Sequence, residues 1–359
     1  MPRETKSDAA RLLLAAARER FAVAATDLLL PDQARLTEWQ RLTAAGLLAR
    51  LVRSVEEQLR AGLAERFAAN EALHAALSSA HVAIALPILE RAQVLRDSEL
   101  TTLLVRRVEE HRFWKARGQA PAEEYLFELV RDRDDGVAAD AMELVIGRSR
   151  RFDRFQEPVM GQVELPAELQ HKLVWMVAAA LRHYIVQHHR VGAVDSAIER
   201  SAGAILAAYD EGDSLEARAM RLARRLHGAG RLDGEALARS IAEGMLPLFI
   251  AGLAVLCSLD QAAAWEVLSD PRGRGPALLL RAAGVGREDA AAILLALNAR
   301  GPLFSGAEGE AAAGQLELYD TVDEGSAREV LRLWQAHPAY RSSIARISTR
   351  ARPAAAEAA

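Results

Sequence analysis

The feature that most constrains the fold of this chain is the spacing of its apolar residues, which recur three and four positions apart along almost the whole sequence. This is the period of an amphipathic helix, and no extended run shows the two-residue alternation of a half-buried strand. The apolar residues are mostly Ala and Leu, which are strong helix formers, and only 5% of the residues are aromatic. The sequence therefore predicts an all-α fold whose helices pack closely on small side chains.

Helix-breaking residues divide the chain at intervals of roughly 10 to 25 residues, which suits helix hairpins. At 359 residues the chain is longer than a usual single core. We therefore expect five parts: an N-terminal amphipathic helix in residues 1–30, HEAT-like stacked helix hairpins in 31–156, a second helical subdomain in 157–300, a terminal helix and linker in 301–349, and a disordered tail in 350–359.

An internal repeat supports the HEAT-like interpretation of the first half. Segments 51–61 and 129–139 both read Leu-Val-Arg, two variable residues, an acidic pair, one variable residue, an aliphatic residue, another variable residue and Ala. Their starts differ by 129 minus 51, or 78 residues, about twice the length of a two-helix HEAT unit. We expect the acidic pairs, Glu56–Glu57 and Asp134–Asp135, to cap the second helix of each hairpin rather than to act as catalytic carboxylates.

Charge and cysteine content limit the kinds of partner and the compartment. The net charge of -4 gives no global positive field of the kind that gathers nucleic acid or anionic lipid. The single cysteine, Cys257, ends an apolar run and has no second cysteine for a disulfide or a zinc site, so we expect a buried thiol in a reducing cytoplasm. Residues 12–30 carry four charged residues between Arg18 and Asp27, which argues against a signal peptide or a membrane span.

Histidines gather near the end of a predicted helix, at His183, His188 and His189. The spacing lacks the two histidines four apart with an intervening glutamate that a metalloprotease helix needs. A metal site would have to take ligands from elsewhere, such as His171 or Asp195. We therefore expect no metal and no cofactor, with His183 and His188 as the weak candidates.

Two basic segments interleaved with aromatic residues, 148–155 and 111–117, are candidate binding sites. Their arginines could contact phosphates while their aromatic rings stack on bases, provided that both segments share one concave face. The structural alternative for 148–155 is a helix C-terminus whose arginines face the helix dipole and whose phenylalanines close the core. The candidate ligand- or partner-binding residues are Arg117, Arg148, Arg150, Arg151, Phe152 and Phe155.

A third candidate is the segment 270–276, in which Arg272 and Arg274 precede a predicted helix. Free amides at a helix start, together with guanidinium groups, can bind an anion. The segment lacks the lysine and the Ser or Thr of a phosphate-binding loop and follows no strand, so a plain interhelical turn is the alternative. No nucleophile elbow is present either, and we expect no catalytic residue.

Several stretches carry a resemblance to a known family: 51–65, 82–89 with 95–100, 165–169 with 181–182, and 246–256 with 277–284. With these stretches the chain resembles, from about Leu47 to Leu297, a bacterial family of all-helical, HEAT-like proteins catalogued as a domain of unknown function and known from alphaproteobacterial genomes. The resemblance implies a cytoplasmic protein of helical repeats. It supplies no catalytic residue that can be carried over by position.

Together these features favour a non-catalytic helical-repeat module or adaptor that binds a protein partner, in bacterial regulation or signalling. Enzyme activity is left open but is not favoured, and the partner is unknown. Nucleic-acid binding through the basic-aromatic segments is one alternative. Sensing of a metal or a small anion, through His183, His188, Arg272 or Arg274, is another.

Overall fold

The computed structural model describes residues 36–79, 82–116, 124–189, 191, 194–270, 273–300 and 312–337, and single residues at 340, 341, 343, 344 and 347. All regular secondary structure in this part of the chain is helical, and the one extended pairing is an isolated antiparallel bridge between Phe152 and Pro158. The predicted all-α class is confirmed. The helix predicted in 1–30 and the tail predicted in 350–359 lie outside the described residues.

The chain divides into two compact units, residues 1–42 and 43–359. In the first unit, Thr37 and Gln40 form a capping box at the start of a long helix. The Gln40 amide donates to the Thr37 hydroxyl over 3.3 Å, and the Thr37 amide donates to the Gln40 side-chain oxygen over 2.6 Å. These bonds satisfy two of the amides that a helix start leaves without partners.

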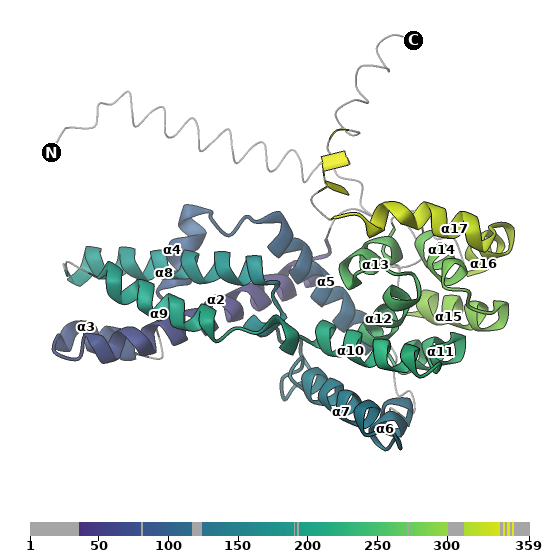
Figure 1. Cartoon of the computed structure of the whole chain (residues 1–359). Coiled ribbons are helices and arrows are strands. Elements are labelled where there is room, and N and C mark those ends of the chain that lie inside the picture. Colours follow the sequence, from purple (N-terminus) through teal and green to yellow (C-terminus); the bar gives the residue numbers. More distant parts are fainter. Residues whose placement is uncertain are drawn as a thin grey trace, which may run out of the picture. The chain divides into compact units, whose positions relative to one another are not determined.

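The second unit contains two apolar cores, and Figure 1 labels the helices that build them. We call the first the α8 core; it is built by α2 (Glu38–Arg66), α3 (Glu71–Ser78), α4 (Ala85–Ala92), α5 (Ser98–Lys115), α8 (Ala167–His189) and α9 (Asp195–Ala207). We call the other the α12 core; it is built by α6 (Glu124–Val130), α7 (Asp135–Ser149), α10 (Leu215–Gly228), α11 (Gly234–Ala242), α12 (Leu246–Leu256), α13 (Gln261–Leu268), α14 (Gly275–Ala282), α15 (Arg287–Ala299), α16 (Ala312–Thr321) and α17 (Glu324–Leu331). Short 3-10 turns are η2 (Gln162–Glu164), η3 (Glu211–Asp213) and η5 (Arg332–Gln335).

Helical spacing explains the α8 core. Leu173, Val177 and Leu181 are four residues apart on α8, and all three are fully buried. Leu51 and Leu59 of α2 are fully buried as well. Burial of a leucine or valine side chain contributes roughly 1.5–3 kcal/mol, so these stripes are a main source of the stability of this core.

The α12 core is built around a helix that is apolar on nearly all sides. The first eight residues of α12 are buried except Pro247, which occupies the first turn, where a missing amide hydrogen does no harm. The helix packs against α10, α11, α13 and α14. Cys257 caps its C-terminal end and is buried as predicted, and burial raises the pKa of its thiol to about 12. The thiol is therefore protonated and unreactive at neutral pH.

The two cores interleave along the sequence. Residues 47–108 and 160–202 supply the α8 core, and residues 113–144 and 215–331 supply the α12 core. Helix α5 takes part in both, because its first turns enter the α8 core and Phe113 enters the α12 core. Each core thus draws on both sides of residue 156, the predicted boundary between the helical repeats and the second subdomain.

The predicted equivalence of segments 51–61 and 129–139 is wrong. The first segment lies wholly inside α2, whereas the second contains the turn between α6 and α7. Asp134 is the N-cap of α7, as predicted, and its carboxylate accepts bonds from the amides of Gly136 and Val137 over 2.8 and 3.1 Å. Asp and Gly favour such a turn, and the first segment has neither. The HEAT-like stacking loses this support and stays a prediction.

Glu56 caps a different helix from the one predicted. Its buried carboxylate accepts hydrogen bonds of 2.9 Å from the amides of Ile84 and Ala85, which begin α4. Arg60 pairs with Glu56 over 3.2 Å and also donates to the carbonyl oxygen of Leu77 at the end of α3. One ion pair on α2 therefore satisfies backbone groups at the ends of two short helices.

No single helix of the described residues has both the length and the apolar composition needed to cross a membrane. Helices α12 and α13 reach that composition only when taken together, and a bend of 104° separates them.

We expect Gly275→Ala to destabilise the protein, because α13 and α14 meet closely at this residue. A Cβ atom here would lie 1.7 Å from the backbone carbonyl oxygen of Val267, a contact that no side-chain rotation relieves. The free energy of unfolding should fall by about 3 kcal/mol. Urea denaturation followed by circular dichroism measures it.

Gly203→Ala in α9 is the matched control. Nothing lies within 4 Å of a Cβ atom at Gly203, so the higher helix propensity of Ala should raise stability by about 0.5–1 kcal/mol. If both substitutions shifted stability in the same direction, the close helix contact at Gly275 would be refuted.

Candidate functional site

The basic segment 148–155 does not present its arginines on one surface. Arg151 is only 3% exposed, Arg148 is half-buried, and Arg150 is exposed at the C-cap of α7. Phe152 is half-buried, while Phe155 is 70% exposed. The segment thus runs from the surface into the interior and back again, and its residues belong to different environments.

The other predicted anion-binding residues are not brought together with this segment. Arg117 and Arg272 lie outside the described residues. Arg274 is exposed at the N-cap position of α14, where its amide donates to the Asp270 carboxylate over 3.1 Å. This contact belongs to an interhelical turn.

The predicted histidines lie on the outer side of α8. His183 and His188 are exposed. The other groups considered as metal ligands have partners: Asp195 pairs with Arg182, and the imidazole of His171 accepts a hydrogen bond of 3.1 Å from an indole one turn along α8. Within the described part of the chain, no three His, Cys, Asp or Glu side chains are placed to hold one metal ion.

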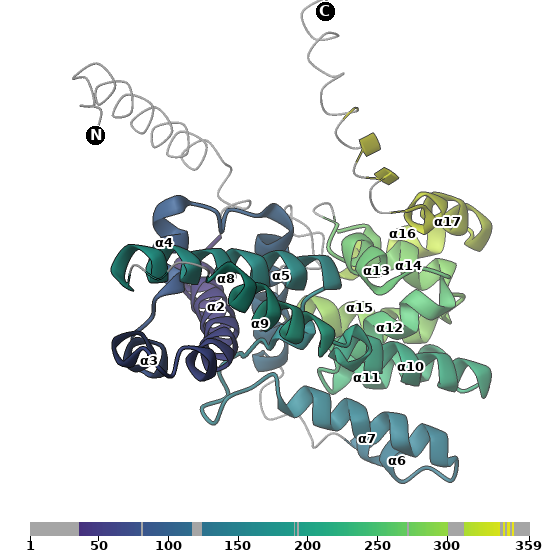
Figure 2. The ribbon, with the colours of Figure 1, turned by 60° about the vertical axis from the view of Figure 1, so that its left-hand side comes forward.

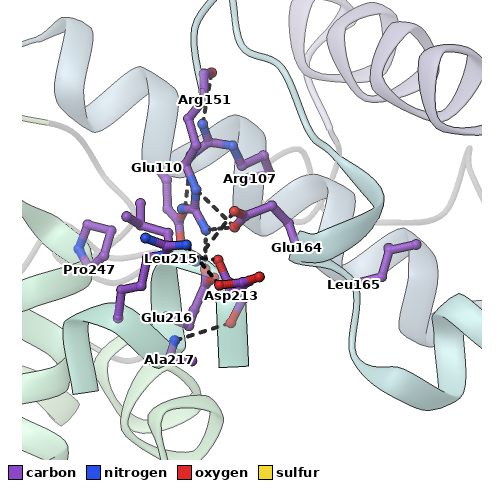
Figure 3. A network of polar contacts seen from close by, with 12 residues as sticks. Arg107, Glu110, Arg151, Glu164, Leu165, Asp213, Leu215, Glu216, Ala217 and Pro247 are labelled. Atoms are coloured by element: carbon purple, nitrogen blue, oxygen red, sulfur yellow. Dashed lines mark hydrogen bonds and ion pairs between the residues drawn. The ribbon is translucent and has the colours of Figure 1, made fainter. Parts of the chain in front are cut away.

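Arg151 is the centre of a buried ion network, which Figure 3 shows from close by. The Arg151 network consists of Arg107, Glu110, Arg151, Glu164 and Glu216. Arg151 contacts the carboxylates of Glu110 over 2.8 Å and Glu216 over 2.6 Å, and it also pairs with Glu164. Arg107 pairs with Glu110 over 3.2 Å and donates to the backbone carbonyl of Arg151 over 3.0 Å.

These residues come from three elements and from the segment that follows α7. Arg107 and Glu110 lie one turn apart on α5, Arg151 follows α7, Glu164 ends η2, and Glu216 lies in the first turn of α10. A carboxylate in the first turn of a helix is stabilised by the helix dipole. The network thus ties together segments that contribute to both cores.

Mutual pairing keeps the network charged. Burial disfavours the charge of Arg151, but the carboxylates of Glu164, Glu216 and Glu110 outweigh burial and raise its pKa. Burial, followed by repulsion from Arg151, lowers the pKa of Arg107 to about 10, so this residue is still protonated at neutral pH. Because each charge is held by opposite charges, the groups stabilise one another and are not available to a substrate.

Two of the three acidic partners of Arg151, Glu164 and Glu216, have pKa values shifted in opposite directions. Burial raises the pKa of Glu164 above 4.5, although Arg151 acts against this shift. Burial also opposes ionisation of Glu216, but there the charges of Arg151 and Arg106 prevail and lower the pKa to about 2. The neighbouring cations, Arg151 first, therefore keep Glu216 ionised despite its burial.

A buried histidine lies beside the network. His111 is 1% exposed, and its ring contacts Trp114 and Phe152 with centroid distances of 5.9 and 5.8 Å. Burial, with a smaller effect from Arg107, lowers its pKa to about 4, so the imidazole is neutral at neutral pH. The adjoining cavity measures about 30 Å³, room for roughly two water molecules. This region supports the structure and has no space for an organic substrate.

A groove between α4 and α8 is the candidate binding site, and Figure 2 shows the two helices side by side. We call it the α4–α8 groove. Its volume is about 490 Å³, within the usual range for ligand sites. The lining residues are Ile88, Leu89, Arg91, Ala92, Val94, Met176, Ala179, Ala180 and His183.

Local backbone geometry shapes one end of the α4–α8 groove. Helix α4 ends in a left-handed residue, Gln93, with φ of 57°. The Gln93 amide donates to the Glu90 carbonyl over 3.1 Å, and the Val94 amide donates to the Leu89 carbonyl over 3.3 Å. This Schellman pattern folds the chain back on the helix. It leaves Val94 beside Leu89 in the lining, where Val94 is 45% exposed.

A second cavity, of about 270 Å³, lies between α2 and the segment after α3. Its buried charged residues, Glu56 and Arg60, already cap the ends of neighbouring helices. They have little capacity left for a ligand, so the α4–α8 groove is the stronger candidate.

Substitutions of two neighbouring arginines, one inside the Arg151 network and one outside it, test whether the network stabilises the fold. Arg151→Met should lower the free energy of unfolding by about 3–5 kcal/mol, because it leaves Glu110, Glu164 and Glu216 without their shared cation. Arg150→Met removes an exposed charge and should stay within about 0.5 kcal/mol of the parent protein. Chemical denaturation of both variants measures the difference, and equal stabilities would rule out the network as described.

Glu216 should make the protein sensitive to acid. Its folded pKa of about 2 lies below the ordinary 4.5, so its contribution to stability is complete above pH 4.5 and is lost as the pH falls towards 2. Glu216→Gln should therefore lower stability at pH 7 and flatten the decline between pH 4.5 and 2. Denaturation curves across this range test it, with Glu211→Gln at an exposed position as control. A decline as steep as in the parent would contradict it.

Comparison with known proteins gives a family. The curated proteins and the solved structures yield no match. Residues 122–332 match a bacterial family described as uncharacterised protein conserved in bacteria (DUF2336), and this segment is more than half of the 359 residues. It runs from the start of α6 to the end of α17, so it begins later than the likeness expected from about Leu47. The chain belongs to this family of bacterial domains of unknown function.

Proposed function

We propose that the protein is a non-catalytic binding module, an adaptor whose α4–α8 groove accepts a helix of a partner protein. The observation that carries this proposal is the groove itself: about 490 Å³ of space whose lining is apolar apart from Arg91 and His183. An apolar groove between helices is suited to the apolar face of an amphipathic helix.

The spacing of lining residues on α8 fits a helical ligand. Met176, Ala180 and His183 follow one another at intervals of four and three residues, and Ala179 lies beside them. From Met176 to His183 the helix rises by about 10.5 Å, which is two turns. The small alanines allow another helix to approach closely, at the 8–10 Å axis separation typical of packed helices.

The wall of the α4–α8 groove is held in place before any partner arrives. Glu56 on α2 binds the first amides of α4, and the Schellman pattern at Gln93 fixes its other end. A preformed groove loses little conformational entropy on binding, so more of the contact energy appears as affinity.

Two further observations support a protein partner over the alternatives. The lining of the α4–α8 groove has no carboxylate and no nucleophile beside a base, so it offers no acid–base pair for chemistry. Of the four arginines in segment 148–155, Arg151 is buried in the ion network and Arg148 is half-buried, so only Arg150 and Arg154 are exposed; this weakens the support for nucleic-acid binding through this segment. HEAT-like stacking, a cytoplasmic location and a role in bacterial regulation or signalling complete the proposal.

Site-specific photocrosslinking in the native cell tests the proposal. A photoreactive residue at Val94, in the groove lining, should crosslink to one discrete partner that mass spectrometry identifies. The same residue at Leu295 on α15, which is 63% exposed, serves as the control for chance encounters. The proposal fails if Val94 and Leu295 give the same crosslinks, or if Val94 gives none.

Ala179→Glu should block the interaction. It places a charge in the apolar lining at an exposed position of α8, so the Val94 crosslink and the affinity for the identified partner should fall at least about tenfold. Stability should change by no more than about 0.5 kcal/mol. Ala292→Glu, the same change at an exposed alanine of α15, should leave binding intact. Equal loss in both variants would argue against the groove.

A further inference from the structure

We infer that the partner helix carries a carboxylate at the edge of its apolar face and that this carboxylate pairs with Arg91. The inference rests on the proposed function, because it names the chemistry of the helix that the α4–α8 groove would accept.

The polar side chains that line the α4–α8 groove are basic, and none is acidic. Arg91 and His183 are its polar side chains; the arginine is a permanent hydrogen-bond donor and the imidazole is able to donate. No carboxylate contributes to the lining. A ligand that fills the groove therefore meets positive charge and donors at its polar edge, which favours an acidic residue over a basic one.

Arg91 has no acidic partner of its own among the residues that the structure describes. Other basic side chains near the groove are engaged: Lys172 contacts Asp97 over 3.4 Å, and Arg182 pairs with Asp195. Lys172 and Arg182 thus already have carboxylate partners, and the guanidinium of Arg91 stays exposed beside the groove.

The position of Arg91 on α4 suits it to a rim contact. It follows Ile88 by one turn on the same face, in the last turn of the helix, where the dipole favours a cation. The aliphatic stem of an arginine can lie on apolar surface while its guanidinium reaches the solvent. In that position the guanidinium can bind a carboxylate through two parallel hydrogen bonds.

The expected effect is one of selectivity more than of affinity. An exposed ion pair changes binding by up to about fivefold, and the like-charged combination is disfavoured in turn. A partner helix with lysine or arginine at the same edge should therefore bind measurably more weakly.

Two labelled peptides of 18 residues test the inference on the full-length protein. Both carry leucines at positions i, i+3, i+4 and i+7 of one face, and they differ only in having glutamates or lysines along the edge of that face. Fluorescence anisotropy at low salt should show the glutamate peptide binding up to about fivefold more tightly, with a smaller difference at high salt. Arg91→Glu should invert the order, and Arg91→Gln should abolish the preference.

Arg224→Glu is the matched control, because it changes the net charge equally at an exposed position of α10 and should leave the order intact. Equal binding of the two peptides, an order that survives in Arg91→Glu, or binding of neither peptide would overturn the inference. Equal binding that Ala179→Glu still abolishes would leave the helix-binding function standing. If the Val94 crosslink were also absent, both the acidic partner helix and the helix-binding function would be refuted. Concentration-dependent self-association abolished by Ala179→Glu would assign the groove to a second copy of the chain instead.

Discussion

The ion pairs of Arg151 fix the relative position of the two apolar cores, which apolar packing alone would not fix. Hydrophobic packing has no direction, so two cores rich in Ala and Leu could slide against one another at little cost. The Arg151 network removes that freedom, because its carboxylates come from α5, η2 and α10 and each must find the same cation (Figure 3). A displaced arrangement would leave a buried charge without its partner, and this is far less favourable than a misplaced methyl group.

The sequence predicted the features that depend on residues close together in the chain. The all-α class follows from apolar spacing, the N-cap at Asp134 from a short acidic side chain before a helix, and the burial of Cys257 from its apolar neighbours. The role of Arg151 could not be predicted in this way. In the sequence it is one of several arginines in a basic run, and the carboxylates that bury it lie 41, 13 and 65 residues away. Here a charged side chain is buried only because partners that are distant in the sequence pair with it.

The same limit explains the false repeat and the unforeseen groove. Segments 51–61 and 129–139 share a pattern of residue types, but only the second has the Asp and Gly residues that turn the chain, so one is a helix interior and the other a helix junction. The α4–α8 groove is lined by residues nearly ninety positions apart in the sequence. It also depends on the left-handed backbone conformation of Gln93, which glycine adopts more readily than other residues. Its lining residues, including Arg91, carry no local signal, because apolar helix faces occur throughout the chain.

Helix α5 passes from one core into the other, with Leu104 buried in the α8 core and Phe113 in the α12 core. Neither core can come apart without exposing part of this shared helix, so the loss of one removes support from the other. We therefore expect the two cores to unfold together rather than one after the other, although the buried side chains of the described residues fall into two clusters.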